Sequence, residues 1–447
     1  MPALALALQL LAITHATVID PDAAAPRRDM TILVRATRVV RVAPSATVQL
    51  PAGAQVIDAT GKFVIPGMWD MHVHNDFSGG RALLPLYIAH GVTGVRDMNG
   101  RLATLRAFQR DIAAGTLVGP RMVVSGPYLV GRPLPPAFGM EHFVVTDSAS
   151  AVRGVDTLVA LGVDFIKVHN WIPAPAARVI AAEARRRNVV YAGHVALPRT
   201  PVQAAREGQR SQEHLYAFVN QCSASDSAVI AGGAPLQRFL MGGCTSSSQA
   251  SVYAQLARAR RWVTPTLIVQ EALATMRPTI VAGDSTAQFY NDTLMRRIAL
   301  EMELPSEPPP ATVAAGGKLF EKRLALVRAL HLAGVPLLGG TDTPLAAGGP
   351  GKGLMGELQL LVKAGLSPRA ALRTVTTEPA RYFATDSIGA VAAGRLADLV
   401  ILDANPLTDI GNLTRIHTVV ANGRAYDAAA RGALVDGARR AARASGR

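Results

Sequence analysis

Cysteine, lysine and long apolar runs are scarce in this sequence. Of its 447 residues two are cysteine, Cys222 and Cys244, and only six of the 46 basic residues are lysine. One cysteine pair fits either a single disulfide in an oxidising compartment or two free thiols. No run of 18 apolar residues is present, so the sequence predicts no transmembrane helix. Hydrophobic residues make up 49% and charged residues 17% of the chain, which excludes disorder throughout.

Acidic residues are also few, and the formal net charge is +14. The arginines form no long basic run, and no zinc-finger, RNP or P-loop pattern accompanies them, so a nucleic-acid partner is not indicated. The excess charge either favours an anionic substrate by electrostatic steering or has no functional meaning. The apolar segment 1–15 lacks a basic start and is interpreted as the remnant of a secretory signal or as a first strand. A periplasmic or secreted location is favoured over a cytoplasmic one.

Short apolar runs alternate with Ala- and Arg-rich helical segments from residue 63 onward. Helices are expected at 101–114, 148–161, 175–187, 201–208 and 354–375. Eight strands are expected between them, at 63–65, 92–97, 122–125, 165–169, 189–195, 212–215, 263–269 and 336–341. This alternation is typical of a (β/α)8 TIM barrel, an α/β fold, here over residues 63–376. The stretch 271–335 is too long for one crossover helix, so it predicts a helical insertion over the barrel mouth.

Both ends of the chain have the pattern of short β-strands. The runs 16–20, 29–35, 39–42 and 55–58 alternate with turns, and the pattern returns at 397–402 and 416–421. The simplest arrangement pairs the two ends. We therefore expect a small β-sandwich domain made of residues 1–62 and 377–447.

The most informative motif is the segment 66–74, PGMWDMHVH. Residues two apart in a strand point to the same face, so His72 and His74 are expected to face the barrel axis and to share one metal ion. Further metal-binding groups end later strands, where barrel enzymes place their chemistry. These are Lys167, His194, His214 and Asp342.

These residue types suit a metal-dependent hydrolase. Imidazoles and carboxylates bind Zn²⁺-like ions, and two such ions can bridge and activate one hydroxide. Asp342 can both bind an ion and accept the proton as general base. Lys167 as an ammonium would be repelled by the ions. After reaction with CO2 it becomes an anionic carbamate, which can bridge two ions. The alternative is a buried ion pair of Lys167 with Asp164 or Glu213.

The set His-x-His, Lys, His, His, Asp resembles the amidohydrolase superfamily. The segments 66–74, 163–168 (VDFIKV), 213–215 (EHL) and 339–343 (GGTDT) are similar to its imidazolonepropionase-like branch, which includes Xaa-Pro dipeptidases and ochratoxinase-type amidases. The segment 393–400 (AGRLADLV) resembles that family's return into its β-domain. Imidazolonepropionase itself lacks the lysine, so Lys167 argues against that activity.

The resemblance implies a role for each of these residues. His72, His74 and Asp342 match the ligands of the first metal ion, and His194 and His214 match those of the second. Lys167 matches the carboxylated bridging lysine of dinuclear members. The resemblance thus implies two divalent ions, with zinc expected, and a CO2-derived carbamate on Lys167.

Substrate contacts are less clearly marked. Tyr128 follows a strand and is a candidate donor to a tetrahedral oxyanion, and Tyr216 is a second candidate. Arg96 and Arg132 are candidates for holding a substrate carboxylate, although Arg96 alternatively pairs with the adjacent Asp97. His90, His142, His331 and His417 are interpreted as structural or surface residues. So is His169, although it shares a strand face with Lys167.

The expected function is hydrolysis of a C–N amide bond in a small carboxylate-bearing molecule. Substrates are a Xaa-Pro dipeptide, an N-acyl amino acid or an ochratoxin-type amide, so the enzyme is a dipeptidase or an amidase acting outside peptide chains. A homo-oligomer is expected. One alternative is a lactonase or organophosphate-type esterase with the same dinuclear site. Another is a non-catalytic anion-binding barrel.

Overall fold

The computed structural model describes residues 10–76, 80–134, 139–196, 199–215, 217–218, 250–275, 287–290, 310–344 and 348–445. Residues 1–9 and the predictions for Tyr216, Cys222 and Cys244 lie outside this part of the chain. None of the helices that it contains has the length and apolarity needed to cross a membrane.

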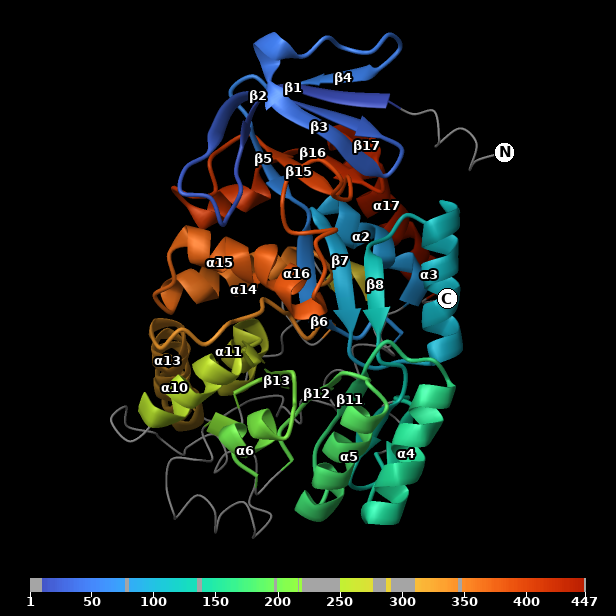
Figure 1. Cartoon of the computed structure of the whole chain (residues 1–447), viewed down its shortest axis with the longest axis vertical. Coiled ribbons are helices and arrows are strands. Elements are labelled where there is room, and N and C mark those ends of the chain that lie inside the picture. The colour runs from blue at the N-terminus through green and yellow to red at the C-terminus, as the bar shows by residue number, and fades with distance from the viewer. Residues whose placement is uncertain are drawn as a thin grey trace.

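The two ends of the chain form one eight-stranded sheet, at the top of Figure 1. Its strand order is β17-β16-β15-β5-β1-β2-β3, with β4 also paired to β1. The strands are β1 (Leu10–Val18), β2 (Arg27–Arg35), β3 (Arg38–Pro44), β4 (Gln55–Asp58), β5 (Phe63–Pro66), β15 (Leu399–Leu402), β16 (Ile416–Ala421) and β17 (Arg424–Tyr426). The short η1 (Ser45–Thr47) and η5 (Ile410–Thr414) lie between strands.

The pairing of β5 with β15 joins the two ends of the chain, as expected, but one strand lies elsewhere than expected. All eight strands are connected by hydrogen bonds, because β1 pairs with β2, β4 and β5 and thereby joins all the N-terminal strands. The run 63–65 was expected as the first barrel strand. Instead β5 pairs with β1 and antiparallel with β15, so Val64 packs in the core of the terminal sheet.

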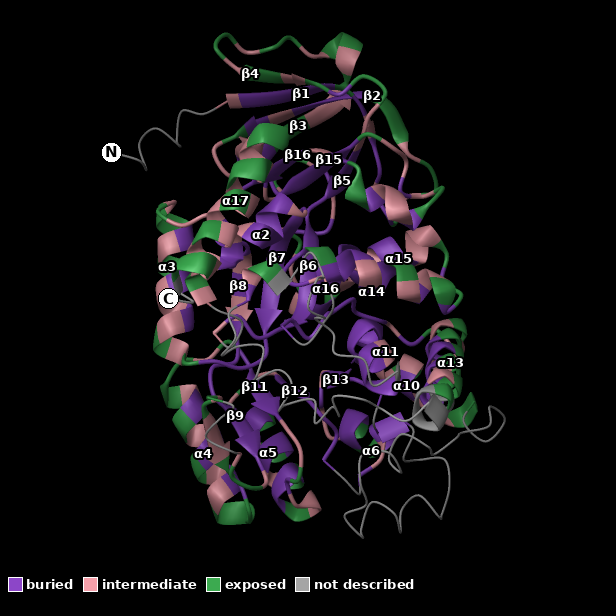
Figure 2. Cartoon of the chain, turned by 180° about the vertical axis from the view of Figure 1, so that it is seen from behind, coloured by how far each residue is buried: buried purple, intermediate pink, exposed green. Residues whose placement is uncertain are grey.

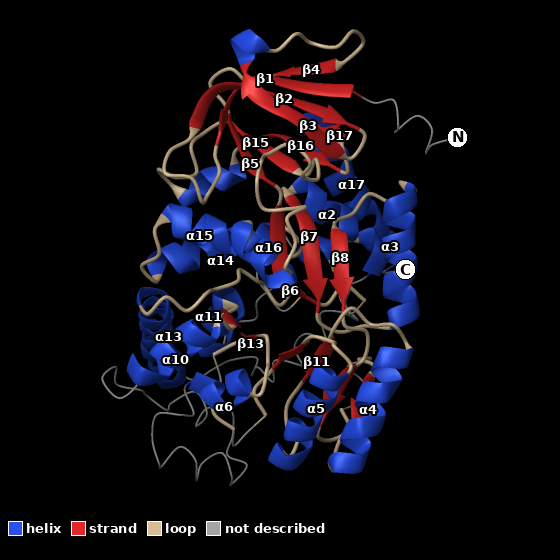
Figure 3. Ribbon diagram, in the orientation of Figure 1, coloured by secondary structure: helices blue, strands red, loops and turns tan. Residues whose placement is uncertain are grey.

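The middle of the chain is α/β with two parallel sheets (Figure 3). One has the order β6-β7-β8 and the other β10-β9-β11-β12-β13-β14. The strands are β6 (Met68–Val73), β7 (Val92–Asp97), β8 (Arg121–Val124), β9 (Tyr128–Val130), β10 (His142–Val144), β11 (Ile166–Val168), β12 (Tyr191–Gly193), β13 (Ser211–Glu213) and β14 (Trp262–Thr264).

Six of the eight expected barrel strands are present, but the structure does not join them in one continuous sheet. Backbone hydrogen bonds nevertheless link the two sheets on both sides. Asp164 N donates to Val124 O at 3.0 Å on one side. On the other, segment 336–343 bridges β14 and β6, with Leu338 N donating to Val263 O (2.9 Å) and Met71 N to Gly339 O (3.0 Å). Segment 336–341 was expected as a strand, but in the structure Leu337 forms an isolated parallel bridge with Val263 and the segment is not a named strand.

Helices surround the buried strands, which Figure 2 shows in purple. They are α2 (Leu84–Ala89), α3 (Leu102–Ala114), α4 (Ser148–Ala160), α5 (Ala174–Arg186), α6 (Pro201–Arg206), α10 (Ala250–Ala259), α11 (Leu267–Thr275), α13 (Pro310–Leu332), α14 (Lys352–Lys363), α15 (Pro368–Thr374), α16 (Thr377–Phe383) and α17 (Ala428–Ser445), with η2 (Gly80–Ala82) and η4 (Ala287–Phe289).

Local sequence explains several helix boundaries. Asp147 and Thr200 begin α4 and α6 with capping boxes, in which each side chain accepts from the backbone three residues ahead. The expected helix 354–375 is two helices, because Gly365 turns the chain with φ of 106° and Ser367 caps a new helix with Pro368 at its first position. Within the expected insertion 271–335, the long α13 packs against α11.

One buried carboxyl group fixes the start of α11. Glu357 on α14 is fully buried and accepts a hydrogen bond from Ile268 N at 2.9 Å. Burial raises the pKa of Glu357 to about 8, although the backbone N–H groups of α11 act in the opposite direction. The folded protein therefore keeps this proton at a pH where the unfolded chain, with a usual pKa of 4.5, has released it.

The raised pKa predicts a stability effect that depends on pH. Because the folded state binds more protons between about pH 4.5 and 8, the contribution of Glu357 to stability falls as the pH rises through this window. Glu357→Gln keeps an acceptor for Ile268 N without the carboxyl group. The Tm of Glu357→Gln minus the Tm of the wild type is expected to be larger at pH 8 than at pH 5.5. Glu321→Gln, on the exposed face of α13, is the control. A Tm difference that does not change with pH contradicts this prediction.

Candidate metal centre

His72 and His74 come from the end of β6, whose residues are all buried. The segment 339–343 runs beside them, with Asp342 N donating to His72 O (2.8 Å) and His74 N donating to Thr343 O (2.8 Å). Gly340 makes this approach possible, because a Cβ there would lie 2.9 Å from the Cβ of His72 and 2.7 Å from Cγ2 of Thr264. Asp342 itself adopts φ of 59° and turns toward the histidines.

The close fit at Gly340 gives a testable consequence. Gly340→Ala is expected to displace segment 339–343 from β6, to destabilise the protein by about 1–3 kcal/mol and to weaken metal binding. Chemical denaturation and metal analysis measure the two effects. Gly317→Ala on α13 is the control, since its Cβ would have nothing within 4 Å. If Gly340→Ala behaves like this control, the packing argument is wrong.

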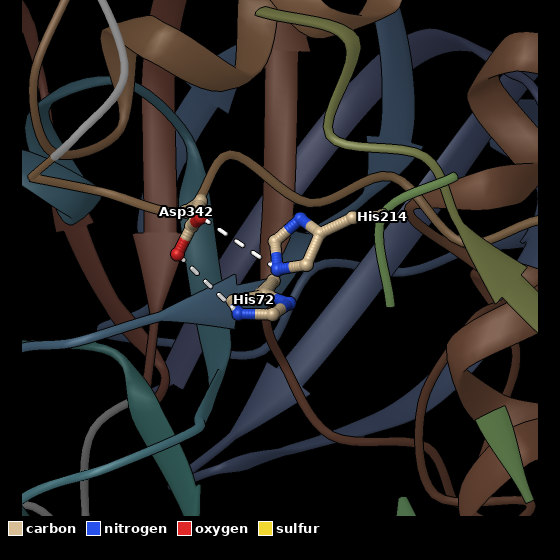
Figure 4. A group of neighbouring side chains, drawn as sticks. All are labelled: His72, His214 and Asp342. Atoms are coloured by element: carbon tan, nitrogen blue, oxygen red, sulfur yellow. Dashed lines mark ion pairs between the residues drawn. The ribbon is translucent and has the colours of Figure 1, made fainter. Parts of the chain in front are cut away.

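The carboxylate of Asp342 faces the rings of His72 and His214 (Figure 4). Its Oδ1 is 3.0 Å from Nε2 of His74 and 3.4 Å from Nε2 of His72, and its Oδ2 is 3.8 Å from Nε2 of His214. Ligand atoms of His72, His214 and Asp342 all lie within 4.8 Å of one another, and the three residues are buried. Although burial alone would raise it, the charges of His214 and His74 lower the pKa of Asp342 to about 2.

Three histidines are oriented by a partner on Nδ1. His72 Nδ1 lies 2.9 Å from Oε2 of Glu213, and His214 Nδ1 lies 2.7 Å from Oγ1 of Thr266. His194 Nδ1 lies 2.7 Å from Oδ1 of Asn170. Such partners fix the ring and leave Nε2 for a metal ion.

The chemistry of these side chains fits a divalent cation. Nε2 of His72 is buried with no hydrogen-bond partner in the described part of the chain. Burial also lowers the pKa of His72 and His194 well below the usual value, and that of His214 to about 4. Neutral imidazoles beside one ionised carboxylate are the donor set of a zinc-type site.

Arg96 supports the site through Glu213, and its position differs from the expected substrate contact. Its guanidinium is fully buried, with Nη2 donating to both carboxylate oxygens of Glu213 at 2.9 and 2.8 Å. Nε donates to Met71 O and Nη1 to Ser211 and Tyr382. With its donors occupied, Arg96 holds Glu213 and is not placed to bind a substrate, and it does not pair with Asp97. Sequence reasoning missed this role of Glu213, whose only signal was its position next to His214.

Lys167 on β11 is buried near the same carboxylates. Burial lowers its pKa to about 8, while the charges of Glu213 and Asp342 raise it. Asp164, an alternative partner, pairs with Arg106 at 2.9 Å. Gly193 on the neighbouring β12 gives Lys167 its space, because a Cβ there would lie 2.9 Å from Cδ of the lysine.

Ring contacts connect four histidines of the site. The ring centroids of His72 and His214 are 4.8 Å apart, as are those of His214 and His194. His169 continues these contacts, 4.3 Å from His194. The structure thus brings the predicted histidine ligands together with Asp342 and adds His169, which the sequence analysis interpreted as structural.

Two of the three remaining predicted contacts lie within the described residues. Tyr128 is buried, its hydroxyl donates to Sδ of Met140 at 3.0 Å, and its ring stacks on His169. Arg132 is exposed, and its Cζ lies 3.8 Å above the ring of Trp171. Tyr216 lies outside the described residues.

Comparisons with known proteins identify a family and similar folds. A model of the amidohydrolase family matches residues 63–426. The fold is similar to that of a Xaa-Pro dipeptidase with bound methionine in its active site (18% identity, 94% of this chain and 100% of that chain, TM-score 0.66). It is also similar to A. niger ochratoxinase (19% identity, 94% and 96%, TM-score 0.65). Adenine deaminase 2 of Jannaschia sp. (strain CCS1) is 39% identical over 71 residues, which span 16% of this chain and 11% of that protein.

Proposed function

The chain belongs to the amidohydrolase family, and on this premise we propose that it is a metal-dependent hydrolase that cleaves a C–N amide bond. One observation carries the proposal, the buried group of His72, His214 and Asp342 with ligand atoms within 4.8 Å of one another. The substrates that we propose carry a carboxylate. They are Xaa-Pro dipeptides or N-acyl amino acids, including ochratoxin-type amides.

We further infer a single barrel around this centre. The hydrogen bonds of Asp164 and of segment 336–343 connect the two parallel sheets on both sides, as in an eight-stranded barrel. The pairing of β5 with β1 moves the first boundary from the expected residue 62 to Pro66. Residues 67–376 then make up the barrel unit, while 1–66 and 377–447 make up the terminal unit.

The ligand sets that we propose follow the resemblance set out in the sequence analysis, and Asp342 lies within reach of both sets. His72, His74 and Asp342 would hold one divalent ion, His194 and His214 would hold a second, and a carbamate on Lys167 would be shared by both ions, with zinc as the proposed metal. When bound, such ions polarise a carbonyl and lower the pKa of water.

The side chains of the protein account for the proton transfers. Asp342 accepts a proton from the attacking water and passes it to the nitrogen of the leaving amine as the C–N bond breaks. Its pKa of about 2 keeps the carboxylate ionised at neutral pH, which a general base requires. Glu213, held by Arg96, keeps the His72 ring in place, and burial of these groups excludes bulk water.

A substrate panel tests the proposed function. The purified protein is given Xaa-Pro dipeptides, N-acyl amino acids, lactones and aryl esters, before and after chelation and after zinc is returned. We expect amide hydrolysis that is lost on chelation and restored by zinc. Full activity of correctly folded, metal-free protein contradicts the mechanism. Turnover of lactones or esters alone contradicts the proposed amide specificity.

Arg132 is the residue that we propose for the substrate carboxylate, since it is exposed and held in place on Trp171. Arg132→Gln is expected to raise KM for an acyl amino acid by about tenfold, the loss of one charge-assisted contact, and to change KM little for the corresponding carboxamide. Arg35→Gln, an exposed arginine of the terminal sheet, is the control. An equal change in KM for acid and amide contradicts this role.

A further inference from the structure

His169 lies inside the candidate site but is not one of the proposed metal ligands. It follows β11 two residues after Lys167, so both side chains point to the same face. Its ring is 4.3 Å from that of His194. The titratable groups close enough to interact with its ring are those of the site itself, namely Lys167, His214, His74 and Asp342.

Nδ1 of His169 is buried and makes no hydrogen bond within the described residues. A buried polar atom left in this state costs about 1–3 kcal/mol, and the fold retains it beside the proposed metal ligands. Because Nδ1 has no exposed surface while the side chain is only partly buried, Nε2 is the ring nitrogen that can carry the proton and reach a bound substrate.

Tyr128 explains how the His169 ring is held. The two rings are stacked with centroids 4.8 Å apart and planes inclined by only 8°. The tyrosine hydroxyl itself donates to Sδ of Met140. His194 contacts the His169 ring as well, so the imidazole lies between Tyr128 and a proposed ligand of the second ion.

We propose that His169 is a catalytic residue, whose imidazole N–H donates a hydrogen bond to the carbonyl oxygen of the scissile amide. Negative charge grows on that oxygen as water attacks, so a fixed donor stabilises the transition state more than the substrate. Tyr128 is then a positioning residue that acts through the stacked ring, and its hydroxyl is not the donor. This inference rests on the proposed amide hydrolysis.

Paired variants separate the two residues. His169→Phe keeps a ring and removes the donor, whereas Tyr128→Phe keeps the stacking ring and removes the hydroxyl. We expect His169→Phe to lower kcat/KM by about 10²- to 10³-fold, and Tyr128→Phe to remain within about threefold of wild type. His169→Gln, which restores an N–H donor, is expected to recover part of the activity. Metal content is expected to stay at the wild-type value in all three variants.

Two inhibitors provide a readout that a purely structural role would not change. The first is a methylphosphonamidate analogue of the best N-acetyl amino acid substrate, with tetrahedral oxygens that mimic the transition state. The second is its ketomethylene isostere, which keeps a planar carbonyl and has CH2 in place of NH. We expect His169→Phe to lose affinity for the first by about the factor lost in kcat/KM, and to lose much less for the second.

The outcomes distinguish this inference from the proposed function. Unchanged kcat/KM in His169→Phe overturns the assignment of His169, as does a 10²-fold loss in Tyr128→Phe. Loss of an ion from His169→Phe also overturns it, because His169 would then be a metal ligand. A wild-type protein that hydrolyses no amide of the panel removes both the proposed function and this inference.

Discussion

Asp342→Asn is expected to lower kcat/KM for amide hydrolysis by about 10³-fold, equivalent to about 4 kcal/mol of transition-state stabilisation. Asparagine has the shape of aspartate but carries no charge and cannot accept the proton of the attacking water. The carboxylate oxygens also lie 3.0 to 3.8 Å from Nε2 of three histidines, so the substitution removes the negative charge that these rings face. Steady-state kinetics on the substrate panel measure the loss.

Asp436→Asn provides the matched control for this variant. Asp436 is exposed on α17 and pairs with Arg439 one turn away, so its replacement is expected to leave kcat/KM unchanged. Metal analysis of Asp342→Asn separates loss of the general base from loss of an ion. Activity of Asp342→Asn within about threefold of wild type would exclude Asp342 as the base.

Lys167→Ala is expected to bind one divalent ion per chain where the wild type binds two, and to lose most of its activity. The proposed carbamate would form when the neutral amine of Lys167 attacks the carbon of CO2, so that an N–C bond forms and one proton is released. Without this group, the second ion keeps only His194 and His214 as ligands from the proposed set. Metal analysis and ¹³C NMR of protein prepared with labelled bicarbonate measure the two effects.

Adding a small carboxylate to Lys167→Ala distinguishes a bridging role of Lys167 from a general loss of structure. Added acetate or another small carboxylate is expected to restore part of the second ion in Lys167→Ala, because it replaces the missing anion. Lys322→Ala, at an exposed position of α13, is the control and is expected to keep both ions. Retention of two ions by Lys167→Ala rules out the carbamate bridge.

Much of the metal centre could be predicted from local sequence. The His-x-His pair and the later Lys, His, His and Asp stand in or next to expected strands, and all of these strands except the one before Asp342 are present. The helix boundaries were predictable where caps are strong, as at Asp147 and Thr200. Segment 63–65 was misplaced because an apolar run of this length has the same pattern in either sheet. Only its pairing with β1 and β15 distinguishes them.

The sequence by itself therefore determined the family, the α/β character and the six candidate ligands, because these depend on residue type and spacing along the chain. The tertiary structure alone decided which groups support them. Arg96 was predicted to bind substrate, yet it is buried against Glu213, which lies 117 residues away and orients His72. Likewise the stacking of His169 between Tyr128 and His194 joins three separate strands. Contacts of this kind depend on how the strands are placed side by side, and a one-dimensional pattern does not encode their distances.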